Sequence, residues 1–239
     1  MKYEAVTFDY WNTLLPETHE AFEARVLFWG EILDNHGHAF THDQVRDAFK
    51  HSWTVFEAKW KANEQSDAAD CSADAWTHLG ITPEPSLADE LVEAYWKAAD
   101  YVPRELLPNV EETVDRLRGL GLRVGIICDV GSTPSTQLRS WLDELGILFM
   151  FHHFSFSDEV GVYKPDPVIF HHALEGLGVS DPSRAAHVGD IRRTDIAGAR
   201  GVGMTGIRYK GHRDDPEEGD EADHVIDDHL MVLDVLGLR

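Results

Sequence analysis

The sequence has little cysteine, no long apolar run and no leader-like N-terminus. Its only cysteines, Cys71 and Cys128, lie far apart in 239 residues and show no partner pattern, which excludes a disulfide framework and a cysteine-based zinc site. No window approaches about 18 consecutive apolar residues, as a membrane-spanning helix needs. The first residues, Met-Lys-Tyr-Glu, lead directly into a strand pattern without a basic segment or a long apolar stretch. We therefore predict a cytoplasmic protein that does not bind a membrane.

Basic residues are also few, 21 against 43 acidic residues, and the formal net charge is −22. Because like charges repel, we expect no binding to nucleic acid or to an anionic membrane surface. The acidity fits either a role in solubility or a source with a salty cytoplasm, and composition does not separate the two. A hydrophobic content of 43% is ample for a packed core. The oligomeric state is left open by the sequence.

Short apolar runs alternate with helical patterns over much of the sequence. Strands are predicted at 3–9, 122–128, 151–156, 185–188, 204–208 and 224–226, and helices at 109–120, 134–145, 166–177 and from about 194. This alternation predicts an α/β fold with a parallel sheet covered by helices on both faces, and with ligands at the carboxyl ends of the strands. Asp9, Cys128 and Asp190 fall at such ends. The acidic stretch from Asp214 to Asp223 is interpreted as a solvated loop.

Residues 17–102 follow a different pattern that is helical throughout. Apolar residues from Phe22 to Leu33 recur at three-to-four spacing, and Thr41 with Gln44 predicts a capping box at the start of the next helix. Two more helices are predicted in this region, at 69–79 and 85–100. We therefore predict a helical domain at 17–102, inserted into a core domain made of residues 1–16 and 103–239.

Three aspartates and one lysine are candidates for chemistry. Asp9 ends the first strand, where a carboxylate can act as a nucleophile, although an isolated aspartate there is more often a turn or cap residue. Asp190 and Asp195 occur in H-V-G-D-I-R-R-T-D, and Asp195 alone could instead be a charge facing a helix N-terminus. Carboxylates that converge require a cation, and Mg²⁺ prefers such ligands. Lys164, in V-Y-K-P-D-P, can offset the same negative charge.

Taken together and in this order, the segments D-Y-W-N-T-L, V-Y-K-P-D-P and G-D-I-R-R-T-D resemble the motifs of the haloacid dehalogenase-like (HAD) hydrolase superfamily. The resemblance implies a HAD-like Rossmannoid core with an inserted α-helical cap of the C1 type. It also implies a Mg²⁺-dependent phosphohydrolase that acts on a small anionic, phosphorylated metabolite through an aspartyl-phosphate on Asp9, with Lys164 as its cation. The implied metal ligands are Asp9, the backbone carbonyl of Trp11 and Asp190. Asp195 is implied either as a further ligand or as a neighbour of the ligands. The implied substrate contacts are Thr13, Cys128, Asp129 and Ser132.

Two residues depart from the family pattern. Trp11 stands where phosphatases of the family have a second aspartate, which protonates the leaving group, and Cys128 stands where they have a serine or threonine. Indole cannot replace a general acid or base, and a thiol is a weaker hydrogen-bond donor than a hydroxyl. Two alternatives therefore stay open. One is a metal-independent 2-haloacid dehalogenase with Asp9 as carbon nucleophile, and the other is a catalytically impaired binding protein on the same scaffold.

Overall fold

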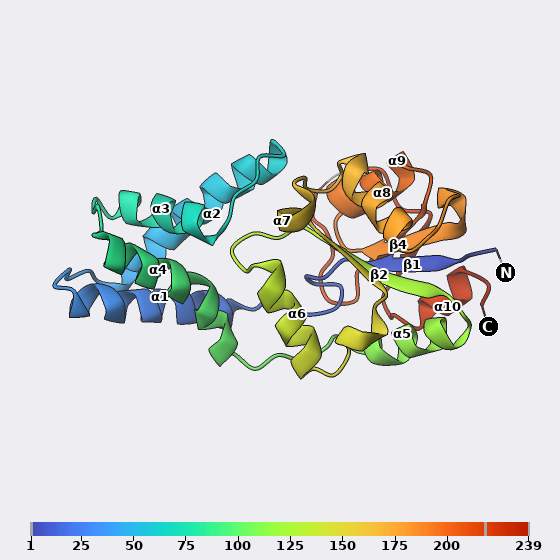
Figure 1. Ribbon diagram of the computed structural model, residues 1–239, viewed down its shortest axis with the longest axis horizontal. Helices are drawn as coiled ribbons and strands as arrows, with labels where there is room; N and C mark the ends of the chain where they lie inside the picture. Colours follow the sequence, from blue (N-terminus) through green and yellow to red (C-terminus); the bar gives the residue numbers. More distant parts are fainter. Residues whose placement is uncertain (1, 218, 239) are drawn as a thin grey trace. The chain divides into compact units, whose positions relative to one another are not determined.

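The computed structural model describes residues 2–217 and 219–238. The chain divides into two compact units (Figure 1): one comprises Met1–Pro16, Arg104–Asp129 and Leu138–Arg239, and the other comprises Glu17–Pro103 and Val130–Gln137. The sequence analysis did not anticipate that residues 130–137 group with the helical unit. The role of that unit as a cap stays a prediction.

The first unit is built on a parallel sheet of six strands in the order β3-β2-β1-β4-β5-β6. The strands are β1 (Ala5–Phe8), β2 (Arg123–Cys128), β3 (His153–Phe156), β4 (Ala185–Gly189), β5 (Thr205–Tyr209) and β6 (His224–Ile226). From β1 the chain adds β2 and β3 on one side of that strand, and it then returns to add β4, β5 and β6 on the other side. The strand order therefore reverses between β1 and β4, and open α/β sheets bind ligands at such a reversal.

The central strand β1 is formed by Ala-Val-Thr-Phe, and all four residues are buried. A short apolar run of this kind is typical of a strand that is covered on both faces. In its register with β4, Phe8 lies opposite Val188. Asp9 and Asp190 therefore leave the sheet at the same edge and from neighbouring strands.

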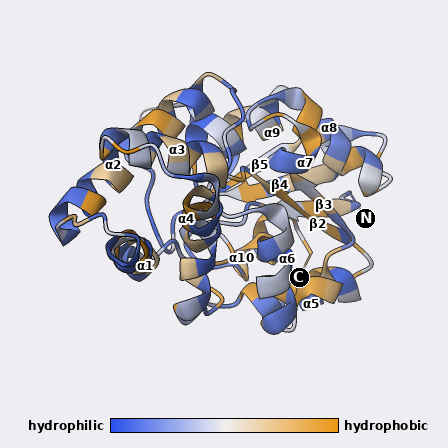
Figure 2. Ribbon diagram, turned by 60° about the vertical axis from the view of Figure 1, so that its left-hand side comes forward, coloured by the Kyte–Doolittle hydropathy of each residue, from blue (hydrophilic) through white to orange (hydrophobic). Residues whose placement is uncertain are grey.

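Helices cover both faces of the sheet, and the predicted α/β fold is confirmed. Figure 1 shows α8 and α9 on one face and α5 and α10 on the other, and Figure 2 shows the strands between them coloured as hydrophobic. The helices of this unit are α5 (Val110–Gly119), α7 (Ser157–Val160), α8 (Pro167–Gly176), α9 (Ala197–Gly201) and α10 (Met231–Val235). The helix α6 (Ser135–Glu144) belongs to this unit from Leu138 onward. Short 3₁₀ segments η2 (Leu148–Met150) and η3 (Pro182–Arg184) precede β3 and β4.

The helix expected from about residue 194 begins differently from the prediction. Residues Arg192–Ile196 form a π-helical turn, η4, and the α-helix α9 starts only at Ala197. π-Helical turns are rare and occur often at functional sites. This one carries Asp195, so it sets the direction of a candidate site residue.

The second unit contains α1 (His19–Asn35), α2 (His42–Lys61), α3 (Ala68–His78), α4 (Pro85–Lys97) and the 3₁₀ segment η1 (Ala98–Tyr101). The predicted capping box at Thr41 and Gln44 is present at the start of α2. The aromatic rings of Trp29, Phe49 and Tyr95 pack together inside this unit. In the described part of the chain, no helix is both long and apolar enough to cross a membrane.

The acidic stretch after β5 is an exposed loop, as interpreted, except that Asp215 is buried and that ion pairs anchor the loop. We name residues 210–223, apart from residue 218, the 210–223 segment. The Arg208 side chain donates hydrogen bonds to Glu221 at 2.8 and 3.0 Å and to Asp214 at 2.5 Å. Asp215 is buried and accepts the backbone N–H of Arg192 at 2.7 Å. Arg208, which directly precedes the segment, and Arg192, which lies 23 residues before Asp215, therefore hold the segment in place.

Candidate functional site

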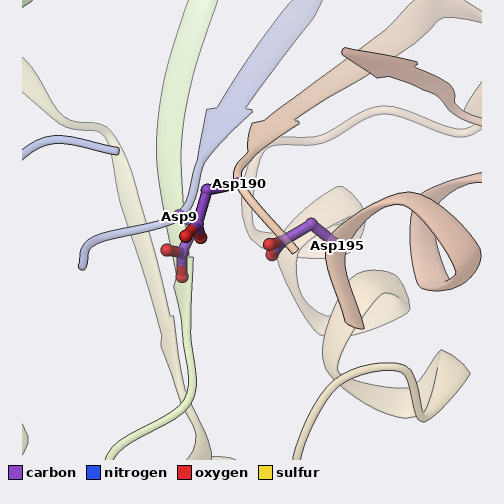
Figure 3. A group of neighbouring side chains, drawn as sticks. All are labelled: Asp9, Asp190 and Asp195. Carbon is purple, nitrogen blue, oxygen red and sulfur yellow. The ribbon is translucent and has the colours of Figure 1, made fainter. Parts of the chain in front are cut away.

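Three carboxylates meet at the sheet edge between β1 and β4 (Figure 3). Asp9, Asp190 and Asp195 are buried, and each offers an oxygen within 4.8 Å of the other two. Asp9 follows β1, and its backbone N–H continues the ladder to the carbonyl of Val188 at 2.8 Å. Asp190 follows β4, and Asp195 points toward both from η4. The structure therefore brings together three residues that lie up to 186 positions apart in the sequence.

A glycine makes room for the third carboxylate. A Cβ atom at Gly189 would lie 2.2 Å from Cγ of Asp195, which is closer than atoms can approach. The Asp195 carboxylate is further fixed by the backbone N–H of Ile191, which donates to Oδ2 at 2.9 Å. The G-D-x-x-x-x-D spacing thus has a steric reason here, because the second aspartate folds back over the glycine.

Lys164 lies within the cluster, as expected for a residue that offsets its charge. Its Nζ donates hydrogen bonds to Oδ1 of Asp9 at 2.5 Å, to Oδ1 of Asp195 at 2.7 Å and to the Ile127 carbonyl at 3.2 Å. Its backbone N–H donates to Oδ1 of Asp129 at 2.8 Å. One oxygen of Asp129, a predicted substrate contact, therefore positions Lys164.

Two of the three carboxylates have raised pKa values, because burial disfavours their charged forms. Burial raises the pKa of Asp9 to about 7, although Lys164 opposes the rise. Burial, together with Asp9 and Asp195, raises the pKa of Asp190 to about 8, and Arg213 opposes that rise. For Asp195 burial also acts to raise the pKa, but Lys164 and His187 outweigh it and lower the pKa. Negative charge at Asp9 and Asp190 is thus incompletely neutralised by protein groups.

This donor set fits a divalent ion such as Mg²⁺. Carboxylate oxygens are the ligands that Mg²⁺ prefers, and the two aspartates with raised pKa values are those that would gain most from a nearby cation. No residue in the described ranges donates a hydrogen bond to the Trp11 carbonyl, the third predicted ligand. Among residues 2–217 and 219–238, only this group of side chains combines three candidate ligands.

His187 is a site residue that the sequence analysis missed. It lies in β4, fully buried, with Nε2 at 3.1 Å from Oδ1 of Asp195 and Nδ1 at 2.9 Å from the Thr7 hydroxyl. Burial lowers its pKa, so the ring is neutral at pH 7 and can donate one proton to Asp195 while it accepts one from Thr7. A lone polar residue within the apolar strand A-A-H-V-G was the available signal, because buried polar groups require partners.

The remaining predicted residues occupy different surroundings. Trp11 is half-buried, with its ring edge-on to Tyr10 and to Trp141 at centroid distances of 5.1 and 6.0 Å. Cys128 is buried, and burial and Asp9 raise its thiol pKa well above the usual range, so it stays a neutral thiol. Its Sγ–H donates to the Asp129 carbonyl at 3.4 Å.

Thr13 is buried, and its hydroxyl has no hydrogen-bond partner within the described residues. Its carbonyl accepts a hydrogen bond from Nε2 of His229 at 2.7 Å, which fixes the backbone after Asp9. Ser132 is half-buried and belongs to the second unit, in Val130–Gln137. The two predicted hydroxyl contacts therefore lie in different units of the chain.

The fold and this cluster match a known class of enzymes. The family described as haloacid dehalogenase-like hydrolase matches residues 3–203. The chain therefore belongs to the HAD-like hydrolase family, and the resemblance seen in the sequence is confirmed.

Curated relatives of the chain include several phosphatases. It is 30% identical to a ribulose-1,5-bisphosphate 5-phosphatase of Halopiger xanaduensis, over 93% of this chain and 95% of the relative. It is 35% identical to a glyceraldehyde 3-phosphate phosphatase of Methanopyrus kandleri, over 66% of this chain and 67% of the relative. For other curated relatives, such as a phosphoserine phosphatase of Thermus thermophilus, the chain spans about half of their length.

Solved structures of both phosphatases and dehalogenases share the fold. A HAD phosphatase from Thermococcus onnurineus is 26% identical, with a TM-score of 0.66 over 98% of each chain. A 2-haloacid dehalogenase from Pseudomonas syringae is 22% identical, with a TM-score of 0.72 over 98% of each chain. At that identity the likeness shows the fold alone, and it does not decide between the two activities.

Proposed function

We propose that the protein is a Mg²⁺-dependent phosphohydrolase that acts on a small phosphorylated metabolite through an aspartyl-phosphate on Asp9. The observation that carries the proposal is the buried arrangement of Asp9, Lys164, Asp190 and Asp195 at the sheet edge. The names of the curated relatives support phosphate esters as substrates. A bound Mg²⁺ would be held by Asp9, Asp190 and the Trp11 carbonyl, and it would neutralise charge on the phosphoryl group.

Each residue has a distinct role in this proposal. Lys164 takes one oxygen of Asp9, so Oδ2 is left to attack phosphorus, and the substrate oxygen departs as the phosphoryl group is transferred. Lys164 stays next to the nucleophile as a fixed positive charge. It stabilises the negative charge that develops on the oxygens of the phosphoryl group during the transfer. Asp195 has both oxygens engaged by Lys164, His187 and Ile191. We therefore give Asp195 a positioning role.

Trp11 limits which substrates react well. A general acid contributes roughly 10² to 10⁴ in rate, and the indole at this position has no proton of suitable acidity to give. A leaving group that needs no proton, such as the carboxylate of an acyl phosphate or the phosphate of a pyrophosphate, loses little from the substitution. We therefore propose that acyl phosphates and pyrophosphates react faster than alkyl phosphates of similar size.

The test is a panel of alkyl phosphates, acyl phosphates and 2-haloacids, assayed with Mg²⁺ and with a chelator. We expect Mg²⁺-dependent release of phosphate that is lost in Asp9→Asn. Halide released from a 2-haloacid in the presence of chelator would establish a dehalogenase instead. Binding of Mg²⁺ and phosphate without turnover of any substrate would establish an impaired enzyme that serves as a binding protein.

A further inference from the structure

The 210–223 segment carries a basic residue to the carboxylate cluster. Arg213 lies near the start of the segment, and its Nη2 donates a hydrogen bond to Oδ2 of Asp190 at 3.1 Å. The Asp190 side chain is almost fully buried, whereas 45% of the Arg213 side chain is exposed. Arg213 therefore lies at the boundary between the buried cluster and solvent.

The position of Arg213 is fixed by anchors on both sides of it. On the N-terminal side, the backbone N–H of Lys210 donates to the Ile226 carbonyl at 2.9 Å. On the C-terminal side, Asp215 accepts the backbone N–H of Arg192, two residues after Asp190, and the Asp215 carbonyl accepts from Nη1 of Arg192 at 2.8 Å. These contacts hold the segment against the turn that also carries Asp190.

Most hydrogen-bonding capacity of Arg213 is unused. A guanidinium group has five N–H donors, and within the described residues Arg213 makes one hydrogen bond, to Asp190. The other donors are available to a ligand. A planar guanidinium suits the oxygens of a phosphoryl group because two parallel hydrogen bonds can form at once.

The location of Asp190 relative to Asp9 gives these donors a target. Oxygens of the two carboxylates lie within 4.8 Å of each other, so a phosphoryl group under attack by Asp9 lies beside Asp190. The guanidinium that contacts Asp190 is then within reach of the same phosphoryl group. Of the three carboxylates, the buried lysine pairs with two, those of Asp9 and Asp195. A second protein cation reduces the repulsion that an incoming anion meets.

We propose that Arg213 is a substrate-binding residue that contacts the phosphoryl oxygens of the substrate and of the product phosphate. The inference rests on the proposed function, since it assumes that a phosphoryl group is presented to Asp9. The rival role is that of a counter-ion that only neutralises Asp190. A counter-ion acts through its charge alone, so the phosphate affinity of the wild type would be retained in Arg213→Lys, which keeps the charge.

The experiment is calorimetric titration of the Mg²⁺-loaded protein with inorganic phosphate, for the wild type, Arg213→Gln and Arg213→Lys. Arg200→Gln is the matched control, because Arg200 has the same 45% exposure and pairs with Asp223 of the same segment. We expect the Kd for phosphate to rise about tenfold in Arg213→Gln, in keeping with the loss of charged hydrogen bonds. Arg213→Lys should show a smaller rise, and Arg200→Gln should show none.

Kinetic measurements separate this inference from the proposed function. With an active phosphate ester, Arg213→Gln should raise KM, whereas Arg200→Gln should leave both KM and kcat unchanged. Unchanged phosphate affinity in Arg213→Lys would overturn the inference while leaving the phosphohydrolase proposal intact. If no substrate is turned over but phosphate binding still depends on Arg213, the proposed function fails and the binding site stands.

Discussion

Replacing Lys164 by methionine should destabilise the protein by an amount that depends on pH. The lysine Nζ bridges Asp9 and Asp195 at 2.5 and 2.7 Å, and all three side chains are at most 8% exposed. Methionine preserves most of the apolar stem and removes the charge. Removing one partner of a buried ion pair costs about 3–5 kcal/mol because the other charge stays buried and uncompensated. We therefore expect a loss of about 3–5 kcal/mol at pH 8 for Lys164→Met.

The pH dependence follows from Asp9. Its pKa is already raised to about 7 by burial, against the lowering effect of Lys164, so without the lysine its pKa rises further. At pH 5 Asp9 then carries a proton and its share of the penalty disappears, while the buried carboxylate of Asp195 keeps its share. At pH 8 both shares are present, because keeping Asp9 either charged or protonated costs free energy there. Urea unfolding of the metal-free wild type and variant at both pH values measures the two costs. A loss below about 1 kcal/mol at pH 8, or an equal loss at both pH values, would refute this reasoning.

Three further outcomes are expected. Trp11→Asp should accelerate hydrolysis of alkyl phosphates by roughly 10² or more and that of acyl phosphates far less; equal effects on both, measured as kcat, would show that the missing acid is not limiting. Gly189→Ala should lower the free energy of unfolding by about 1–3 kcal/mol and weaken Mg²⁺ binding, because its Cβ would lie 2.2 Å from Asp195. The control is Gly201→Ala, which has open space around its Cβ. Similar urea midpoints for the two variants would contradict the steric argument. Finally, Asp9 and Asp190 bind protons in the folded state up to pH values of about 7 and 8. Because these groups bind more protons folded than unfolded, the metal-free protein should lose stability as pH rises from about 4 to 8, and Mg²⁺ should raise Tm more at pH 8 than at pH 6. An effect of Mg²⁺ on Tm that is independent of pH, or that persists in Asp190→Asn, would contradict this assignment.

Features with a local or periodic signal in the sequence could be predicted. Asp9 and Asp190 follow short apolar runs, and such runs end at one edge of a parallel sheet. The capping box at Thr41 is likewise a pattern of neighbouring residues. By contrast, α7 and α10 have only four and five residues, so they are too short to show helical periodicity.

Features that depend on tertiary contacts were not predicted. His187 appeared to be one more residue of a buried strand, and only the fold shows that its ring joins Thr7 to Asp195. The anchoring of the 210–223 segment was not predicted either, because acidic residues usually face water without a fixed partner. Its partners Arg192 and Arg208 precede it in the chain, and no local pattern reveals which charges will pair.

The most direct test of the central claim is to look for the phosphoryl group on Asp9. The protein is mixed with an acyl phosphate and Mg²⁺ and quenched in acid, and its peptides are then analysed by mass spectrometry. We expect the peptide that contains Asp9 to gain the mass of one phosphoryl group, and we expect no gain in Asp9→Asn. Phosphate release that continues at the wild-type rate in Asp9→Asn would contradict the account.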